Sequence, residues 1–268
     1  MKRISSLQNP RVKDAMRLRQ SRHRRKQGRF LIDGAREISR ALEAGIPAVE
    51  AFVCPALCDT AERTRTLEQV KALGIPVWEI PPQVFERLAF GERTEGILLV
   101  AKSLPRTLAE LAVPERAVVA VVEGIEKPGN LGAILRSADA TGVSVVIVTD
   151  ARSDLYNPNC IRASLGTVFT LPVVEAQSAE ALAWLRKREL RVFAARPDAA
   201  FDYTQADLHA GGAIVLGSEA AGLSNTWNGP EVTPIRLPML GVADSLNVSV
   251  TAAVLFYEAL RQRRASQA

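Results

Sequence analysis

The 268-residue sequence is poor in cysteine, histidine and aromatic residues. Its three cysteines, Cys54, Cys58 and Cys160, are an odd and sparse set, which argues against a disulfide-stabilised domain and is typical of a reducing compartment. No apolar run is long enough to span a bilayer, and the basic N-terminus is not followed by the apolar segment of a signal peptide. The sequence therefore predicts a cytoplasmic protein with no membrane partner.

Motifs of several enzyme classes are also missing. The loop at 123–132 follows a predicted strand and opens a predicted helix, but it contains no G-x-G-x-x-G, and no G-K-[ST] occurs anywhere in the chain. A Rossmann cofactor site and a phosphate-binding P-loop therefore lack support. His23 and His209 have no neighbours that suggest acid–base catalysis, and no second Cys or His pair stands at zinc-ligand spacing from Cys54 and Cys58.

Positive charge is concentrated at the N-terminus. Residues 1–30 contain eleven Lys or Arg and one acid, Asp14, which gives this segment a formal charge of +10. Because the whole chain carries +5, residues 31–268 carry −5. Lysine and arginine gain free energy by displacing counterions from phosphates, so this segment favours a nucleic-acid partner. A solvated basic helix face is the alternative explanation. The arginines expected to contact RNA are Arg22, Arg24 and Arg25.

The N-terminal half alternates between helical and strand patterns. We expect helices at 9–27, 35–44, 60–73 and 82–88, and strands at 29–33, 49–53, 76–80 and 96–101. Asn9 is placed to cap the first helix, with Pro10 in its first turn. Such alternation predicts a compact α/β domain over residues 1–105.

A second α/β pattern follows a proline-containing stretch, in which we place a linker at 106–112. The second domain, 113–268, is expected to have strands at 117–122, 143–148, 169–174, 190–195, 213–216 and 232–237, and helices at 130–141, 158–163, 179–188 and from Ser245 onward. The almost pure Val/Ala strand at 117–122 implies burial on both faces of a parallel sheet.

Three chain breaks near the C-terminus predict a ligand pocket. A buried strand stops at Gly217, where backbone can approach a ligand closely, and a second strand is ended by Pro238. Ser245 is placed to cap the helix that follows. Strand ends and a helix start expose backbone N–H and C=O groups, which suits a flat small molecule with polar edges.

Four polar residues near these breaks are candidates for chemistry, and each has an ordinary alternative. Asn130 stands at a helix start and is explained equally well as a cap, and Arg136 in the second turn as half of a surface ion pair. Glu219 just after a strand and Asn247 in the first turn of the last helix could complement the helix dipole or cap the helix.

Three segments together resemble the SpoU/TrmH family of S-adenosylmethionine-dependent RNA ribose 2′-O-methyltransferases, which belong to the SPOUT class. They are KPGNLGAILRSADATG at 127–142, LGSEAAGL at 216–223, and LPM at 237–239 followed by SLNVSV at 245–250. All three occur in order at suitable spacing, and the resemblance covers essentially the whole chain. Ala220 departs from it, because many members have glycine there.

The resemblance implies a knotted SPOUT-type parallel sheet flanked by helices at 113–268, with a deep trefoil in its C-terminal part, and a smaller L30e-like α/β substrate-binding domain at 1–105. It implies that the methyl donor lies bent in the knot and that no metal is required. The residues expected around the donor are Gly217, Ser218, Leu237, Met239, Ser245 and Leu246. The expected catalytic residues are Asn130, Arg136, Glu219 and Asn247.

The same resemblance implies partners. Family members are usually homodimers with sites built at the subunit contact, where Arg162 would reach a substrate phosphate. The long N-terminal domain favours ribosomal (23S) RNA over tRNA, because minimal tRNA-acting relatives often lack such a domain. A tRNA 2′-O-methyltransferase and a non-catalytic RNA-binding or ribosome-assembly factor are the competing hypotheses.

Arg136 is the expected participant in proton removal from the ribose hydroxyl, a weak nucleophile until it loses its proton. A guanidinium is almost always protonated, so an RNA phosphate bound to Arg136 is the alternative acceptor of the proton. Asn130 would position the ribose or Arg136, Glu219 would hold the motif loops, and Asn247 would fix the pocket. Holding oxygen, methyl and sulfur in line would supply much of the rate.

Overall fold

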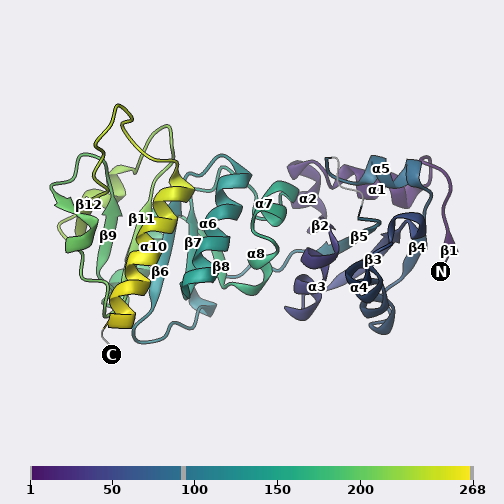
Figure 1. Ribbon diagram of the computed structural model, residues 1–268, viewed down its shortest axis with the longest axis horizontal. Coiled ribbons are helices and arrows are strands. Elements are labelled where there is room, and N and C mark those ends of the chain that lie inside the picture. Colours follow the sequence, from purple (N-terminus) through teal and green to yellow (C-terminus); the bar gives the residue numbers. More distant parts are fainter. Residues whose placement is uncertain (1, 92–94, 266–268) are drawn as a thin grey trace. The chain divides into compact units, whose positions relative to one another are not determined.

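The computed structural model describes residues 2–91 and 95–265. The described residues fall into two compact units, and Figure 1 labels most of the helices and strands of each. The first unit contains Met1–Leu104 and Asp154–Thr170, and the second contains Pro105–Ser153 and Leu171–Ala268. The sequence places residues 154–170 in the C-terminal domain, whereas in the fold they pack with the first unit.

Over its described residues, the first unit has a mixed five-stranded sheet in the order β1-β4-β3-β5-β2. The strands are β1 (Lys2–Arg3), β2 (Arg29–Asp33), β3 (Ala48–Val53), β4 (Val77–Glu79) and β5 (Ile97–Lys102). β5 runs antiparallel to β2 and β3, and the other pairs are parallel. Helices α1 (Pro10–Arg17) and α5 (Pro82–Leu88) share a core with the sheet, while α3 (Ala35–Glu43) packs with α4 (Ala61–Ala72) on its other side (Figure 1).

The single helix predicted over 9–27 is two helices, α1 and α2 (Ser21–Gln27), so that prediction is wrong. Asn9 caps α1 as expected, because its side chain accepts a hydrogen bond from the Arg11 backbone N–H at 2.9 Å. The break follows Leu18, which is buried. Arg24 donates to the carbonyls of Leu18 and Arg19 at 2.8 and 2.9 Å, so a side chain satisfies carbonyls that a continuous helix would have bonded internally.

Residues 154–170 pack against β2 and α3 of the first unit. Helices α7 (Pro158–Ala163) and α8 (Thr167–Thr170) carry this segment, and α8 occupies positions where a strand from 169 is predicted, so that strand start is wrong. Phe30 of β2 stacks on Tyr156 and Phe169, with ring centroids 4.2 and 5.8 Å apart. Such aromatic pairs add stability beyond the area they bury.

The described residues of the second unit form a seven-stranded parallel sheet in the order β10-β12-β9-β11-β6-β7-β8. Its strands are β6 (Val118–Glu123), β7 (Val145–Thr149), β8 (Val173–Ala176), β9 (Val192–Ala195), β10 (Phe201–Asp202), β11 (Gly212–Leu216) and β12 (Val232–Arg236). Every residue of β6 and β11 is buried, which bears out the parallel sheet predicted from the Val/Ala run.

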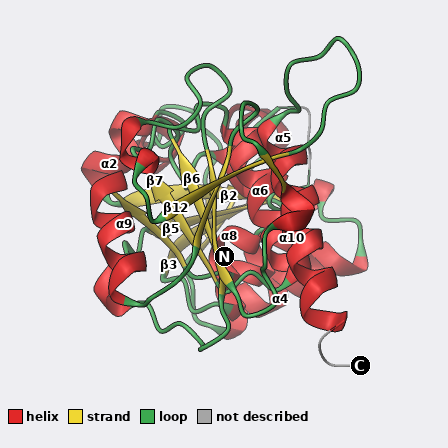
Figure 2. Ribbon diagram, turned by 90° about the vertical axis from the view of Figure 1, so that its left-hand side faces the viewer, coloured by secondary structure: helices red, strands yellow, loops and turns green. Residues whose placement is uncertain are grey.

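Helices cover both faces of this sheet. α9 (Ser178–Lys187) packs on one face, and its Leu185 belongs to the same hydrophobic core as Val121 of β6 and Val215 of β11. α6 (Pro128–Thr141) and α10 (Val248–Ala265) pack against each other on the opposite face, as Figure 2 shows. Short 3₁₀ turns lie in the connections at η1 (Pro55–Leu57), η2 (Leu108–Glu110), η3 (Tyr203–Gln205) and η4 (Asn225–Asn228). No helix within 2–91 and 95–265 is both long and apolar enough to cross a membrane.

The last helix begins later than predicted. α10 starts at Val248, so Ser245 does not cap it. Asn247 is the cap: its side-chain oxygen accepts from the Ser249 backbone N–H at 2.9 Å and from the Ser249 hydroxyl at 2.6 Å. Residues 237–247 therefore form a loop between β12 and α10, long enough to line a pocket.

Candidate active site

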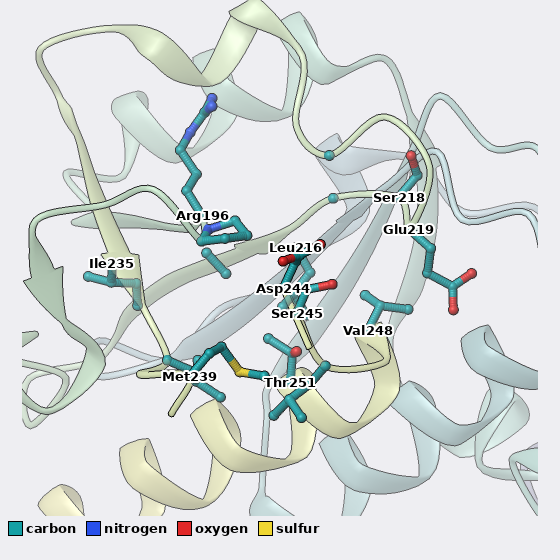
Figure 3. A pocket seen from close by; sticks show the side chains of 16 residues that line it. Arg196, Leu216, Ser218, Glu219, Ile235, Met239, Asp244, Ser245, Val248 and Thr251 are labelled. Carbon is teal, nitrogen blue, oxygen red and sulfur yellow. The ribbon is translucent and has the colours of Figure 1, made fainter. Parts of the chain in front are cut away.

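A cavity of about 260 Å³ lies at the carboxyl ends of β9, β11 and β12 and beside the start of α10. In open parallel sheets, ligands bind where the strands end. The cavity is near the lower end of the roughly 300–1,000 Å³ common for small-molecule sites. Figure 3 shows Arg196 and Ile235 on one side of it, Ser218 and Glu219 on the other, and Met239 with Thr251 toward α10.

The residues predicted around a methyl donor all line this cavity, namely Gly217, Ser218, Leu237, Met239, Ser245 and Leu246. They come from two separate loops, and the fold brings those loops to one place. Sequence reasoning missed other lining residues, among them Arg196, Pro197, Asp244 and Thr251. Arg196 and Pro197 directly follow β9, so the rule that ligands bind at strand ends could have found them.

A tight turn after β11 forms one wall of the cavity. The backbone N–H of Ser218 donates to the Gly222 carbonyl at 3.1 Å, and the Gly222 N–H donates back to the Ser218 carbonyl at 3.0 Å. A side chain at Gly217 would collide with the Gly222 backbone, and Gly222 has a positive φ of 63°. Glycine is therefore required where the turn presses against the strand end.

Three of the four predicted catalytic side chains meet at one carboxylate. Glu219 Oε1 accepts hydrogen bonds from Asn130 Nδ2 at 2.5 Å and from Asn247 Nδ2 at 3.0 Å. Lys127 Nζ lies 3.8 Å from Glu219 Oε2. Because Glu219 also lines the cavity, it joins the starts of α6 and α10 to the pocket wall.

The ordinary explanation of Asn130 as a helix cap is wrong. α6 begins at Pro128, its N-cap is Lys127, and the Asn130 amide is spent on Glu219. For Asn247, capping and the contact with Glu219 coexist, because the oxygen serves the helix and the nitrogen serves the carboxylate.

Arg136 stands apart from this trio. It lies six residues beyond Asn130 on α6, which is about 9 Å along the helix axis. Its side chain is exposed, and it forms no ion pair within the described part of the chain. The surface ion pair offered as its ordinary explanation is therefore absent from these residues, and the guanidinium is available to a ligand.

The arginines predicted to contact RNA differ in availability. Arg22 and Arg25 are exposed on α2. Arg24 is only 4% exposed and is ion-paired with Asp154, with Nε to Oδ2 at 2.7 Å, so its assignment to RNA is corrected. It lies on the inward side of a short helix, where an anion from the same unit neutralises it. Arg162 on α7 is half-buried and donates through Nη1 to the Phe90 carbonyl at 2.9 Å, which occupies part of its guanidinium.

Among residues 2–91 and 95–265, no group of three or more His, Cys, Asp or Glu side chains is arranged to hold a metal ion. The free thiols Cys54 and Cys160 are buried, and burial raises the pKa of each. Buried thiols of this kind are unreactive, which fits a structural role.

A parallel sheet with a cavity at its strand ends, bordered by the C-terminal helix and by a carboxylate held between two asparagines, agrees with the SPOUT-class methyltransferase that the sequence resemblance implies. Residues 117–257 match the SpoU rRNA Methylase family, and residues 9–99 match the MRM3-like substrate binding domain. The chain belongs to the SpoU rRNA Methylase family.

Similar proteins of known sequence extend over nearly the full chain. The 23S rRNA (uridine(2479)-2′-O)-methyltransferase of Streptomyces viridochromogenes is 31% identical, covering 98% of this chain and 93% of its own. The 23S rRNA (guanosine(2553)-2′-O)-methyltransferase RlmP of Bacillus subtilis is 27% identical, covering 96% and 98%.

Solved structures agree with this assignment. A crystal structure described as an RNA 2′-O ribose methyltransferase is 43% identical and superposes with a TM-score of 0.85 over 98% of this chain and 99% of its own. The AdoMet-bound rRNA methyltransferase from Sinorhizobium meliloti superposes with a TM-score of 0.88, at 26% identity, over 97% of both chains.

Proposed function

We propose that this protein transfers a methyl group from S-adenosylmethionine to a ribose 2′-hydroxyl of 23S ribosomal RNA. One observation carries the proposal: Glu219 both lines the strand-end cavity and accepts hydrogen bonds from Asn130 and Asn247. A donor pocket and a polar cluster for substrate thus share a residue. S-adenosylmethionine is the methyl donor of the family, and a relative of 26% identity is described as AdoMet-bound.

The lining of the cavity fits such a donor. Leu237, Met239 and Leu246 offer apolar surface for the faces of a purine ring. Glu219 and Asp244 place carboxylates in the lining, which favours a cationic ligand. The bound donor supplies an electrophilic methyl group on a sulfonium.

We assign the chain's own residues the following roles. Arg136 binds an RNA phosphate, orients the ribose and brings a proton acceptor to the 2′-hydroxyl, since the guanidinium itself stays protonated. Asn130 and Asn247 hold Glu219 and so fix the loops that shape the pocket. In the reaction the oxygen–methyl bond forms, the sulfur–methyl bond breaks, and the hydroxyl proton leaves to the phosphate or solvent.

Ribosomal RNA is supported as the substrate by the extent of the similarity. The relatives named for 23S rRNA align with nearly all of this chain, including the region that matches a substrate-binding domain. A solved structure named for tRNA methylation covers only 57% of it. A protein that acts on RNA in the ribosome is expected in the cytoplasm.

We also propose that the protein forms a homodimer through α10. Val250 and Tyr257 are 48% and 54% exposed on this helix, and Val254 lies between them. Leu246, which lines the cavity, is exposed at the same end. A second copy seated on this apolar face would cover it and adjoin the pocket, as the family resemblance implies. Sedimentation of the wild type as a monomer at micromolar concentration would contradict this.

The trefoil knot expected of SPOUT proteins belongs to the same proposal. Its support is the sheet order β12-β9-β11-β6, which places strands distant in sequence side by side, together with the two long loops that meet at the cavity. A knotted chain is expected to refold slowly after complete denaturation, because a chain end must thread a loop.

The deciding experiment uses purified protein, labelled S-adenosylmethionine and three RNAs: unmodified 23S rRNA, the same rRNA from modified ribosomes, and tRNA. We expect the label in the unmodified 23S rRNA alone. It should lie on a nucleotide whose 3′ phosphodiester bond resists alkaline hydrolysis, because a methylated 2′-oxygen cannot attack that bond. Label in tRNA would show that tRNA is a substrate and would contradict the proposed specificity for 23S rRNA. RNA binding without donor binding in a calorimeter would indicate a non-catalytic RNA-binding factor.

A further inference from the structure

Glu123 is a buried carboxylate that the description of the active site leaves unexplained. It is the last residue of β6 and is only 5% exposed. Removing a carboxylate from water costs several kcal/mol unless hydrogen bonds replace the lost hydration. A charge at this position therefore needs donors, and the identity of those donors indicates what it holds.

Three residues from two segments of the second unit surround Glu123. Its Oε1 accepts from the Ser224 hydroxyl at 2.7 Å and from Trp227 Nε1 at 3.1 Å. The Ser178 hydroxyl lies 2.5 Å from Glu123 Oε1 and 2.6 Å from Asp150 Oδ2, and its single proton is shared between these two carboxylates. Glu123 Oε2 accepts from the backbone N–H of Ser224 at 2.7 Å. Burial alone would raise the pKa of Glu123, but the bonds from Ser178, Ser224 and Trp227 outweigh it and lower the pKa, so the group is ionised at neutral pH.

Two of these donors belong to the loop that forms a wall of the cavity. The chain leaves β11 at Gly217, makes the tight turn from Ser218 to Gly222, and reaches Ser224 two residues later. Trp227 then returns to the core, where it is only 1% exposed. The turn is thus anchored at one end by β11 and at the other by Glu123.

We propose that Glu123 is a positioning residue that fixes the loop 217–228 in the conformation able to bind S-adenosylmethionine. This rests on the assignment of the cavity to that donor. A carboxylate suits the role because the loop presents three donors to it, the backbone N–H and hydroxyl of Ser224 and the indole N–H of Trp227, and a carboxylate only accepts. A neutral amide would turn an N–H₂ group toward another N–H or lose one acceptor.

The test compares Glu123→Gln with the wild type and with Glu115→Gln, a matched change at an exposed carboxylate of the same unit. For Glu123→Gln we expect the dissociation constant of S-adenosylmethionine, measured by calorimetry, to rise about 10- to 100-fold, the loss expected for charge-assisted hydrogen bonds. At saturating donor, turnover should return to within about twofold of the wild type, because the reacting groups are untouched.

Hydrogen exchange separates positioning from general stabilisation. In ligand-free Glu123→Gln, amides of 217–228 should exchange several-fold faster, while those of β7 keep wild-type protection. Faster exchange throughout the second unit, with unchanged donor affinity, would overturn the proposal and leave Glu123 a core-stabilising group. This measurement is made without the donor. If the wild type bound no S-adenosylmethionine, the proposed function would be refuted, but hydrogen exchange would still show whether Glu123 holds the loop 217–228.

Milder variants keep the proposal testable if Glu123→Gln does not fold. Ser224→Ala removes one hydroxyl donor but keeps the backbone bond, and Trp227→Phe removes only the indole N–H. Each should weaken donor binding about 3- to 10-fold, the loss expected for one neutral hydrogen bond. Unchanged affinity in both variants would overturn the proposal.

Discussion

Each unit of this protein buries a carboxylate at the end of a strand, and the two groups are treated very differently. Asp33 ends β2 in the first unit, and Glu123 ends β6 in the second. Glu123 receives hydrogen bonds at both oxygens. At Asp33, the Phe90 backbone N–H serves Oδ2 at 2.8 Å, but Oδ1 meets no donor in the part of the chain that the structure describes.

The pKa values follow from that difference. Burial raises the pKa of Asp33 to about 6, since the single backbone bond and the charge of Arg162 only partly offset it, and nearby Glu95 and Glu37 raise it further. The pKa of Glu123 is lowered in spite of its burial. The number of donors, rather than burial, decides which carboxylate supports the fold. In the second unit the buried carboxylate of Glu123 orders a loop, whereas in the first unit the buried carboxylate of Asp33 lowers the stability of the fold when it is ionised.

The largest effect is expected at Arg136, because it is exposed on α6 and forms no ion pair with the residues that the structure describes. Arg136→Ala should lower methyl transfer at least about 100-fold, the usual contribution of a group that assists proton transfer, and leave donor binding nearly intact. Arg116→Ala, at an exposed arginine of the same unit, is the control. Unchanged turnover in Arg136→Ala would remove this residue from the chemistry.

A methyl group at Gly217 should block the donor pocket. Its Cβ would collide with the Gly222 backbone, and such overpacking costs about 1–3 kcal/mol. We expect Gly217→Ala to weaken S-adenosylmethionine at least about tenfold in a calorimetric titration. Gly241→Ala, where no atom lies within 4 Å of the added methyl, is the matched control. Equal affinities in the two variants would show that the turn does not shape the pocket.

In the first unit, the largest effect on stability is expected at Arg24. Arg24→Ala leaves Asp154 without its ion-pair partner and frees two carbonyls, so unfolding should become easier by about 3–5 kcal/mol, as for other broken buried pairs. Chemical denaturation measures this, with Arg22→Ala as the exposed control. A loss below about 1 kcal/mol would mean that residues 154–170 are not needed to hold the helix break.

Asp33→Asn should stabilise the first unit at neutral pH. The pKa in the fold, about 6, lies above the ordinary 3.8, so the cost of the buried carboxylate is absent below pH 3.8, where both states are protonated. It grows as pH rises from 3.8 to 6 and is complete above pH 6. We expect a gain of roughly 1–3 kcal/mol at pH 7.5 that disappears near pH 4. Asp198→Asn, on an exposed residue, is the control. A gain that does not depend on pH would point to packing instead.

The smallest effect concerns the basic helix α2. Removing Arg22 and Arg25 together should weaken RNA binding and reduce the magnitude of the slope of log K against log salt by roughly 1 to 2. The reason is that a protein with fewer phosphate contacts releases fewer counterions when it binds. Removing Arg65 and Lys71, exposed on α4 of the same unit, should change the slope less. Equal slopes in the two double variants would indicate that α2 is a solvent-exposed basic surface that does not contact RNA.

Local patterns determined much of this protein. The residues that line the cavity were predicted from the resemblance of three short segments to the SpoU/TrmH family, but local patterns predicted much of the rest. The period of apolar residues located most helices and strands within a few residues, and the Val/Ala run at 117–122 predicted the buried parallel sheet. These features depend on neighbours in sequence, because propensity, capping and strand burial act over a few residues.

Tertiary structure decided what depends on distant partners. Only the fold shows that Asn130 serves Glu219 rather than capping a helix, that Arg24 is spent on Asp154, and that residues 154–170 belong to the first unit. The fold also shows that Glu123, at the end of β6, accepts a hydrogen bond from the loop at Ser224, about a hundred residues later in the sequence. A side chain near a helix end or a strand end can bond locally or across the fold, and the choice depends on which donors and acceptors the packed chain brings within about 3 Å.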